Sequence, residues 1–111
     1  MSAESLAEFE LLVMLAALRL GPDEAYAVSI TDDIARRTGR SVRRANVFTT
    51  LQRLEAKGLV ATRLGDPRAE RGGRARRLVT VRPEGAAAVR ATTAAIRAMT
   101  VGLGGIAREP A

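Results

Sequence analysis

The 111-residue chain contains no cysteine and no histidine. Without cysteine it can form neither a disulfide framework nor a thiolate metal site. Without histidine it lacks the commonest general base, the serine–histidine type of catalytic triad and the commonest metal ligand. Paired carboxylates could still act as acid and base, but Asp32 and Asp33 are adjacent and would point apart on a helix. We therefore expect no catalytic residues, no metal and no cofactor, and we do not expect an enzyme.

Aromatic side chains and long apolar runs are also scarce. The chain has no tryptophan, one tyrosine and two phenylalanines. Its longest apolar run, Leu11 to Leu18, is far below the roughly 20 residues that span a bilayer. The acidic amino terminus lacks the positive start of a secretory signal. We expect a soluble, cytoplasmic protein with no membrane partner, built as one domain with a frayed end.

The net charge of +6 is distributed unevenly along the chain. Residues 1–35 carry one basic and seven acidic side chains, a balance of −6. Residues 36–82, the cationic block, carry fourteen basic and three acidic side chains, a balance of +11, and residues 83–111 are close to neutral at +1. An arginine-rich proteome would explain why seventeen of the eighteen basic residues are arginine, but not why the acids avoid the middle. The block indicates a partner with a phosphate backbone.

Two helices are predicted in the first third of the chain. Residues Glu8 to Leu20 are rich in leucine, alanine and methionine, and the segment is apolar nearly all round, so it should be buried on more than one side. A capping box of Ser29 with Asp32 would start the next helix at Ser29, and the alternative is a start nearer Tyr26. It should end at Gly39, where a helix-terminating glycine fits.

A third helix, about Val42 to Lys57, follows after a short turn, which makes the pair a helix-turn-helix candidate. Its apolar face would bring together Val47, Phe48, Leu51 and Leu54. The opposite face would carry Arg44, Asn46, Thr49, Thr50, Arg53 and Lys57.

Two short β segments, Leu59–Leu64 and Arg77–Arg82, enclose a loop that contains the stretch ERGGRARRL. The stretch is therefore expected at the tip of a hairpin, where its glycine pair allows the backbone to approach a groove or a phosphate. A last helix should start at Pro83 and continue to Leu103, with a thin apolar stripe close to a coiled-coil seam. A partner helix should cover that stripe.

The predicted fold class is therefore mainly α with a small antiparallel β hairpin: an α+β winged helix-turn-helix with N- and C-terminal dimerisation helices. Residues 1–82 would form the DNA-binding domain, residues 83–103 the C-terminal dimerisation helix and residues 104–111 a frayed tail. The dimer-interface residues expected from the two apolar helices are Leu11, Leu15, Leu18, Val89, Ile96, Met99 and Leu103.

The residue sequence itself indicates the protein family more specifically than the pattern of helices and strands does. The segments LAEFELLVMLAALRLGPDEAYAVSI, TGRSVRRANVFTTLQRLEAKGLVATRLGDP and ERGGRARRLVTVRPEG resemble the PadR family of bacterial transcriptional regulators over about Leu6 to Val89. The resemblance implies a homodimeric repressor. It places the helix of about Val42–Lys57 in the major groove and the wing, Arg71–Arg77, on the neighbouring backbone or minor groove.

This chain departs from the family pattern at several positions. Phe48 stands where the family commonly has tyrosine, and Ala27 and Ala45 stand where it usually has glycine. Some family members bind flat aromatic compounds between their helices, but this chain has few stacking side chains, which argues against a small-molecule effector. Duplex DNA remains the expected partner, through a loosely palindromic operator that matches the symmetry of the dimer.

DNA contacts can be assigned by residue type. Arginine suits guanine and asparagine suits adenine by bidentate geometry. The residues expected at base edges are Arg44, Asn46 and Thr50. Those expected at phosphates are Arg43, Thr49 and Arg53 on the helix, and Arg71, Arg74 and Arg76 on the wing.

The alternatives to DNA binding are a protein-interaction module and RNA binding. A winged helix can act solely as a protein-interaction module, but such a module has no need of the cationic block. Binding of single-stranded RNA relies on aromatic stacking, and the cationic block offers only Phe48, which the helical pattern assigns to the core.

Overall fold

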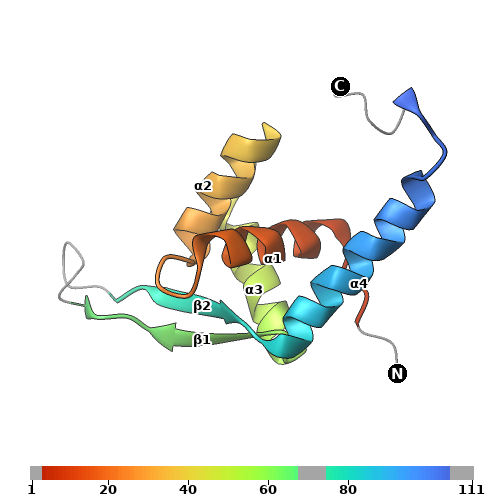
Figure 1. The fold of residues 1–111 in the computed structure, drawn as a ribbon. Helices are drawn as coiled ribbons and strands as arrows, with labels where there is room; N and C mark the ends of the chain where they lie inside the picture. The colour runs from red at the N-terminus through yellow and green to blue at the C-terminus, as the bar shows by residue number, and fades with distance from the viewer. Residues whose placement is uncertain (1–3, 68–74, 106–111) are drawn as a thin grey trace.

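The helices and the hairpin follow one another in the order expected from the sequence (Figure 1). The computed structural model describes residues 4–67 and 75–105. The elements are α1 (Glu8–Leu20), α2 (Ala27–Thr38), α3 (Arg44–Ala56), β1 (Val60–Leu64), β2 (Arg77–Val81) and α4 (Pro83–Thr100). The predicted fold class, mainly α with one antiparallel hairpin, is confirmed.

Helix α1 has the bounds that the sequence predicts and lies at the centre of the fold. Its first turn is capped by the Glu10 carboxylate, which accepts the backbone N–H of Ala7 at 2.9 Å. It ends at Gly21, where φ is 84°. The helix contacts α2, α3, β2 and α4. Leu11, expected at a dimer interface, is instead buried within the chain's own core, because these neighbours cover that side of α1.

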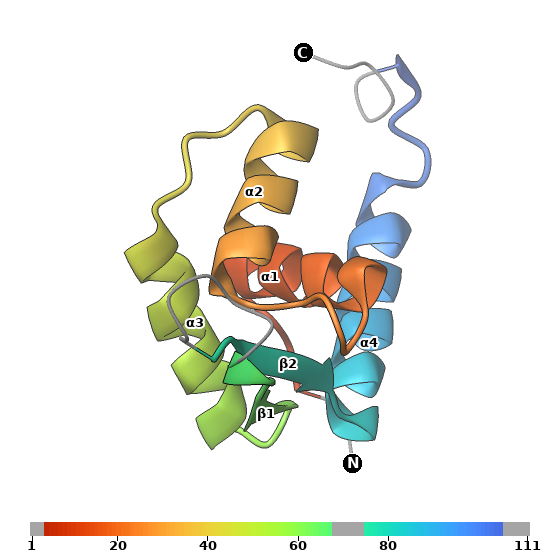
Figure 2. The ribbon, with the colours of Figure 1, turned by 90° about the vertical axis from the view of Figure 1, so that its left-hand side faces the viewer.

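Helices α2 and α3 form the predicted helix-turn-helix (Figure 2). The start of α2 is capped by the Ser29 hydroxyl, which accepts the backbone N–H of Tyr26 at 3.0 Å. The predicted pairing of Ser29 with Asp32 was therefore wrong, because the helix begins two residues before Ser29 and places its hydroxyl over the first turn. Gly39 ends α2 in the left-handed conformation with φ of 73°, as predicted.

Strands β1 and β2 pair in antiparallel register, with Val60 opposite Val81 and Leu64 opposite Arg77. Beyond the ladder the backbone N–H of Gly65 donates to the carbonyl of Arg76 at 2.7 Å. The N–H of Val79 donates to the carbonyl of Ala25 at 2.8 Å, which attaches the hairpin to the α1–α2 connection. The hairpin is thus held against the helical body on one side.

Helix α4 begins with Pro83 at its first position, as predicted, and its first half packs against α1. Val89 was expected at a dimer interface, but it is buried in the chain's own core beside α1. The Thr92 hydroxyl accepts the backbone N–H of Leu6 at 3.1 Å. The far end of α4 extends away from the body of the domain (Figure 1). The helix ends at Thr100, so Leu103 follows the helix rather than extending its stripe.

The core lies between α1, α2, α3, the base of the hairpin and the first half of α4. Among the described residues no buried side-chain nitrogen or oxygen lacks a hydrogen-bond partner. The largest side chains that are fully buried are those of Met14, Ile30, Leu54, Val13, Val47, Val60 and Val79.

Candidate nucleic-acid interface

Helix α3 turns one face inward and leaves the other to solvent. Val47, Leu51 and Leu54 are buried. Thr50 is also buried, with 5% of its surface exposed, so its assignment to a base edge was wrong. It lies three residues after Val47 and four before Leu54, which places it on the inward face of the helix. The other predicted contact residues on or next to α3 are exposed, namely Arg43, Arg44, Asn46, Thr49 and Arg53.

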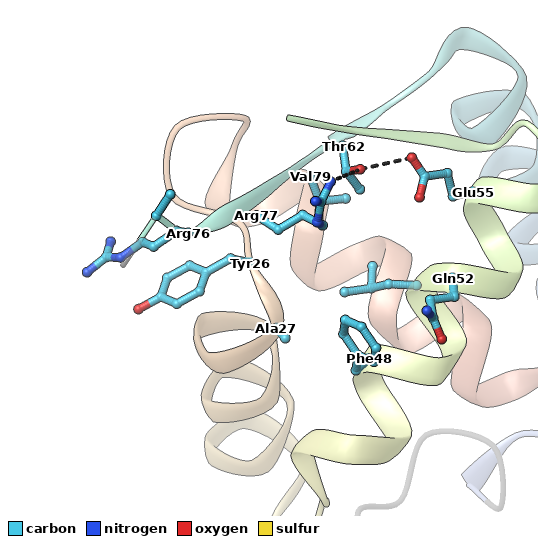
Figure 3. Close-up of a pocket in the computed structure, with 11 residues that line it drawn as sticks. Tyr26, Ala27, Phe48, Gln52, Glu55, Thr62, Arg76, Arg77 and Val79 are labelled. Atoms are coloured by element: carbon cyan, nitrogen blue, oxygen red, sulfur yellow. Dashed lines mark hydrogen bonds between the residues drawn. The ribbon is translucent and has the colours of Figure 1, made fainter. Parts of the chain in front are cut away.

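Phe48 was expected in the core, but 49% of its surface is exposed. It follows Val47 and is therefore rotated by about 100° away from the buried face. The ring lies at the edge of a cavity between α2, α3 and the hairpin, where it faces the same space as Tyr26 (Figure 3). The objection to RNA binding that rested on a buried Phe48 is therefore weaker than the sequence implied.

Acidic side chains from the first 35 residues neutralise part of the cationic block. The Glu8 carboxylate in α1 accepts hydrogen bonds from both terminal nitrogens of Arg40, at 3.0 and 2.7 Å. The Glu10 carboxylate receives the Lys57 ammonium at 3.1 Å. The guanidinium of Arg63 lies 2.9 Å from Asp23. The two oppositely charged segments of the sequence are thus partly paired in the fold.

Asp33 is the most connected acid of this group. Its carboxylate is buried and accepts Arg19 from α1 at 3.2 Å, together with Arg36 at 3.2 Å and Arg37 at 3.0 Å from its own helix. Burial acts to raise the pKa of Asp33, but the hydrogen bonds and charges of Arg37 and Arg19 outweigh it, so the pKa lies below its usual value. Two arginines of the cationic block are therefore committed to an intramolecular site.

The acids of the first turn of α1 are held ionised in the same way. The hydrogen bond from Arg40, with its charge, lowers the pKa of Glu8. For Glu10, burial acts to raise the pKa. The hydrogen bonds from the Ala7 N–H and the Lys57 ammonium lower the pKa by more than burial raises it, so the net shift is downward. Both carboxylates therefore keep their negative charge, and both ion pairs, at neutral pH.

Three guanidinium groups of the helix-turn-helix remain without such partners. The side chains of Arg43, Arg44 and Arg53 make no ion pair or hydrogen bond with another described residue, although the charge of Arg53 helps to lower the pKa of Glu10. All three belong to the exposed side of α3 or its N-cap, together with Asn46 and Thr49. Among the described residues of the cationic block, the guanidinium groups without such partners are therefore concentrated on this helix.

The wing contributes fewer described residues. Arg71 and Arg74, together with the glycine pair of the ERGGR stretch, lie outside the described residues. The Arg76 guanidinium is stacked over the Tyr26 ring, with 4.5 Å from its carbon to the ring centroid. Arg77 donates to the Thr62 hydroxyl at 3.2 Å, and this hydroxyl in turn donates to Glu55 of α3 at 2.9 Å (Figure 3). The hairpin is thereby connected to α3 by side chains.

The described residues form neither a metal-binding cluster nor a membrane-spanning helix. Within residues 4–67 and 75–105, no three histidine, cysteine, aspartate or glutamate side chains are grouped so that they could hold a metal ion. None of the described helices combines the length and the apolar character needed to cross a membrane.

A helix-turn-helix followed by a two-stranded wing defines the winged helix-turn-helix class of fold. No protein-family profile and no curated protein matches the sequence. A crystal structure of a PadR family transcriptional regulator from Eggerthella lenta is similar over 93% of this chain and 88% of that one, with a TM-score of 0.67 and 23% identity. Protein smu.1704 of Streptococcus mutans is similar over 96% of this chain and 93% of its own, with a TM-score of 0.65 and 18% identity.

A further similar structure is that of BpsR from Bordetella bronchiseptica, whose DNA binding is regulated by 6-hydroxynicotinic acid. It covers 94% of this chain and 72% of its own length, with a TM-score of 0.63 and 23% identity. At these identities the likeness establishes a shared fold, which is the fold that the PadR resemblance in the sequence predicts.

Proposed function

We propose that this chain is a PadR-type transcriptional regulator that binds duplex DNA sequence-specifically. The observation that carries the proposal is the outer face of α3. The side chains of Arg43, Arg44 and Arg53 lie there without an ion pair or hydrogen bond to the described residues, while six of the other basic side chains in the block are held in ion pairs. Unpaired guanidinium groups on the second helix of a helix-turn-helix are suited to duplex DNA.

The outer face supports a division of roles. Arg44 and Asn46 lie in the first turn of α3, the part of a recognition helix that reaches base edges in the major groove. Arg43, Thr49 and Arg53 would contact phosphates and position the helix. Wing residues Arg71, Arg74 and Arg76 would add phosphate contacts and salt dependence without much sequence preference.

The proposal includes a homodimer that represses transcription. Along α4, Ile96 and Met99 continue the stripe that begins with the buried Thr92, but they are 50% and 79% exposed. This apolar surface would be covered by a second copy, together with Leu15 and with Leu18 of α1, which is 45% exposed. Residues 1–82 would then bind DNA in the cytoplasm, α4 would join the protomers, and the two recognition helices would be roughly 34–36 Å apart on a palindromic operator.

The test is a titration of fluorescent duplexes from the region next to the protein's own gene, at several salt concentrations, with a scrambled duplex of equal composition. We expect tighter binding to one native duplex than to its scrambled form, and a steep loss of affinity with salt. Equal affinity for native and scrambled DNA at every salt concentration would contradict the sequence-specific function. Binding of neither duplex would contradict DNA binding altogether.

A further inference from the structure

Arg40 lies in the connection between α2 and α3, three residues before Arg43, the N-cap of α3 (Figure 2). Its backbone is held in place by local contacts. Gly39 turns the chain in the left-handed conformation, and the Thr38 hydroxyl accepts the backbone N–H of Arg40 at 3.2 Å. Three residues span at most about 11 Å, so Arg40 starts close to the N-terminus of α3. A change of partner at Arg40 therefore needs only a movement of its side chain.

The Glu8–Arg40 pair differs in burial from the Glu10–Lys57 pair, the other ion pair of the first turn of α1. The Glu10 side chain is 6% exposed. Lys57 cannot leave it without leaving a buried charge unpaired, which is strongly destabilising. The side chains of Glu8 and Arg40 are 68% and 47% exposed, and pairs of this kind contribute little to stability, because water and salt screen them. Arg40 can therefore exchange Glu8 for another anion at small cost.

The Glu8 carboxylate presents to Arg40 the same features as a phosphate group. It accepts both terminal nitrogens of the guanidinium, at 3.0 and 2.7 Å. This two-pronged geometry is also the one in which arginine binds phosphate. The hydrogen bond from Arg40 lowers the pKa of Glu8, so the carboxylate is charged at neutral pH. Glu8 and a phosphate would therefore compete for one guanidinium.

The place of Arg40 in the chain brings it near phosphates when α3 lies in a major groove. The N-terminal residues of a recognition helix reach the base edges, so the connection that leads into the helix passes the backbone at the edge of the groove. Duplex DNA carries one charge for about every 1.7 Å of its axis. Several phosphates are therefore available to a long side chain in this connection.

We infer that Arg40 is a further phosphate-binding residue, which Glu8 holds in the free protein and which duplex DNA takes over on binding. The inference rests on the proposed function, because it needs α3 to lie in the groove. Glu8 then lowers the affinity for every duplex, whatever its sequence. A pair that only stabilised the turn before α3 would have the opposite effect, since its loss would weaken DNA binding. The sign of the change in Glu8→Gln distinguishes the two roles.

The experiment is a titration of the full chain with the native and scrambled duplexes at several salt concentrations. Glu8→Gln should tighten the binding of both duplexes about threefold. Arg40→Gln should weaken both and reduce the salt slope by about 1. Asp32→Asn is the matched control, because it also removes one exposed acid, but one that forms no ion pair with another described residue. Weaker binding by Glu8→Gln, or an equal gain in Asp32→Asn, would overturn the inference.

A double-mutant cycle tests whether Glu8 acts through Arg40. In the Arg40→Gln background, Glu8→Gln should have no more effect than Asp32→Asn has in the unmutated protein. Equal tightening with and without Arg40 would show that Glu8 acts only by repelling DNA, and would overturn the inference. Urea unfolding verifies that each variant is folded, which is expected because the side chains of all three residues are exposed.

NMR follows the exchange of partner directly. The side-chain Nε–H signal of Arg40 is assigned by its absence from the spectrum of Arg40→Gln. In the unmutated protein this signal should shift on saturation with the scrambled duplex. In free Glu8→Gln it should already differ from its position in the unmutated protein, because the carboxylate is gone. An Arg40 signal that does not move on saturation with DNA would show that Arg40 stays on Glu8, which would contradict the exchange.

The scrambled duplex separates this inference from the proposed function. Equal affinities for native and scrambled DNA would contradict sequence-specific binding, whereas the cycle on either duplex would still decide the role of Arg40. A preference for the native duplex without the expected cycle would support the function and refute the inference. If no duplex is bound even at low salt, both proposals fail.

Discussion

The Lys57 ammonium, one residue beyond α3, lies 3.1 Å from the buried carboxylate of Glu10 in the first turn of α1. Two residues earlier in α1, Glu8 holds Arg40 in the turn before α3. The first turn of α1 thus contacts the chain on both sides of α3. Arg40 and Lys57, which flank α3, are neutralised by these pairs, while Arg44 and Arg53 between them are exposed. The orientation of α3 on the body is stabilised by the same pairs that concentrate the available charge on its outer face.

Asp33→Asn should destabilise the protein and remove part of its acid sensitivity. The pKa of Asp33 is lower in the folded protein than its usual value, so its contribution to stability is present above about pH 4 and is lost as the pH falls through the folded pKa. We expect the variant to lose about 1–2 kcal/mol of unfolding free energy at pH 7, since the carboxylate is buried but its arginine partners are largely exposed.

Urea unfolding at pH 7 and pH 3 measures this effect. Asp32→Asn is the control, because Asp32 is the adjacent, exposed residue of the same helix. It should change the unfolding free energy by less than about 0.5 kcal/mol. Equal losses in the two variants would show that the three arginines around Asp33 add nothing.

Gly85→Ala should disturb the junction between the hairpin and α4. A Cβ at this position would overlap the Leu59 carbonyl and approach the Met14 Cε to 2.7 Å. Overpacking of this kind costs about 1–3 kcal/mol, which thermal or urea denaturation would detect. Gly105→Ala meets nothing within 4 Å and should leave stability unchanged. A Gly85→Ala protein as stable as the control would indicate that the junction yields easily.

Asn46→Ala and Arg53→Ala should affect DNA binding in different ways. Loss of a base contact should reduce the preference for native over scrambled DNA, with a cost of about 1–3 kcal/mol on the native site. Loss of a phosphate contact should weaken both duplexes alike and reduce the salt slope by about 1. Arg90→Ala, an exposed arginine on α4, is the control for loss of charge alone. Equal losses on both duplexes for Asn46→Ala would contradict its role at a base edge.

Met99→Glu should dissociate the proposed dimer. Met99 is 79% exposed on the part of α4 that extends past α1, so a charge there would cause no loss of intrachain packing. Sedimentation velocity should show a monomer for Met99→Glu and a dimer for both the unmutated protein and Ala94→Glu, a change on the opposite side of α4. Dimers in all three samples would show that the apolar stripe lies outside the contact.

Thr50→Val tests the corrected position of Thr50. The side chain is buried on the inward face of α3 and cannot reach a base edge. The variant should therefore keep the DNA preference of the unmutated protein in the duplex titration. A changed preference would require α3 to rotate on binding.

The helices and strands were largely predictable because their ends carry local signals. The bounds of α1 were predicted without error. The C-terminal end of α2 followed from Gly39, and the start of α4 followed from Pro83. Side-chain direction on α3 was less predictable, because residue type was given more weight than helical phase. Phe48 was assigned inward as an aromatic residue and Thr50 outward as a polar one, although their spacing from Val47 and Leu54 indicates the reverse.

The ionic pairs could not be predicted because they join residues that are distant in sequence. Glu8 and Arg40 are 32 residues apart, and Glu10 and Lys57 are 47 apart. The sequence reveals that acids and bases are segregated, but only the fold shows which of them meet. The cavity lined by Tyr26 and Phe48 was missed for the same reason, since Tyr26 is the N-cap of α2 and Phe48 lies in α3.

The close approach of Gly85 to the Leu59 carbonyl joins the start of α4 to the base of the hairpin. Arg82, between β2 and α4, donates its backbone N–H to the Leu59 carbonyl at 3.0 Å, the same carbonyl that leaves no room for a methyl group on Gly85. These contacts couple the position of α4 to that of the base of the hairpin. In the proposed dimer, the crossing angle of the two α4 helices would then influence the distance between the two hairpins, so a change at the subunit contact would alter the surface offered to DNA.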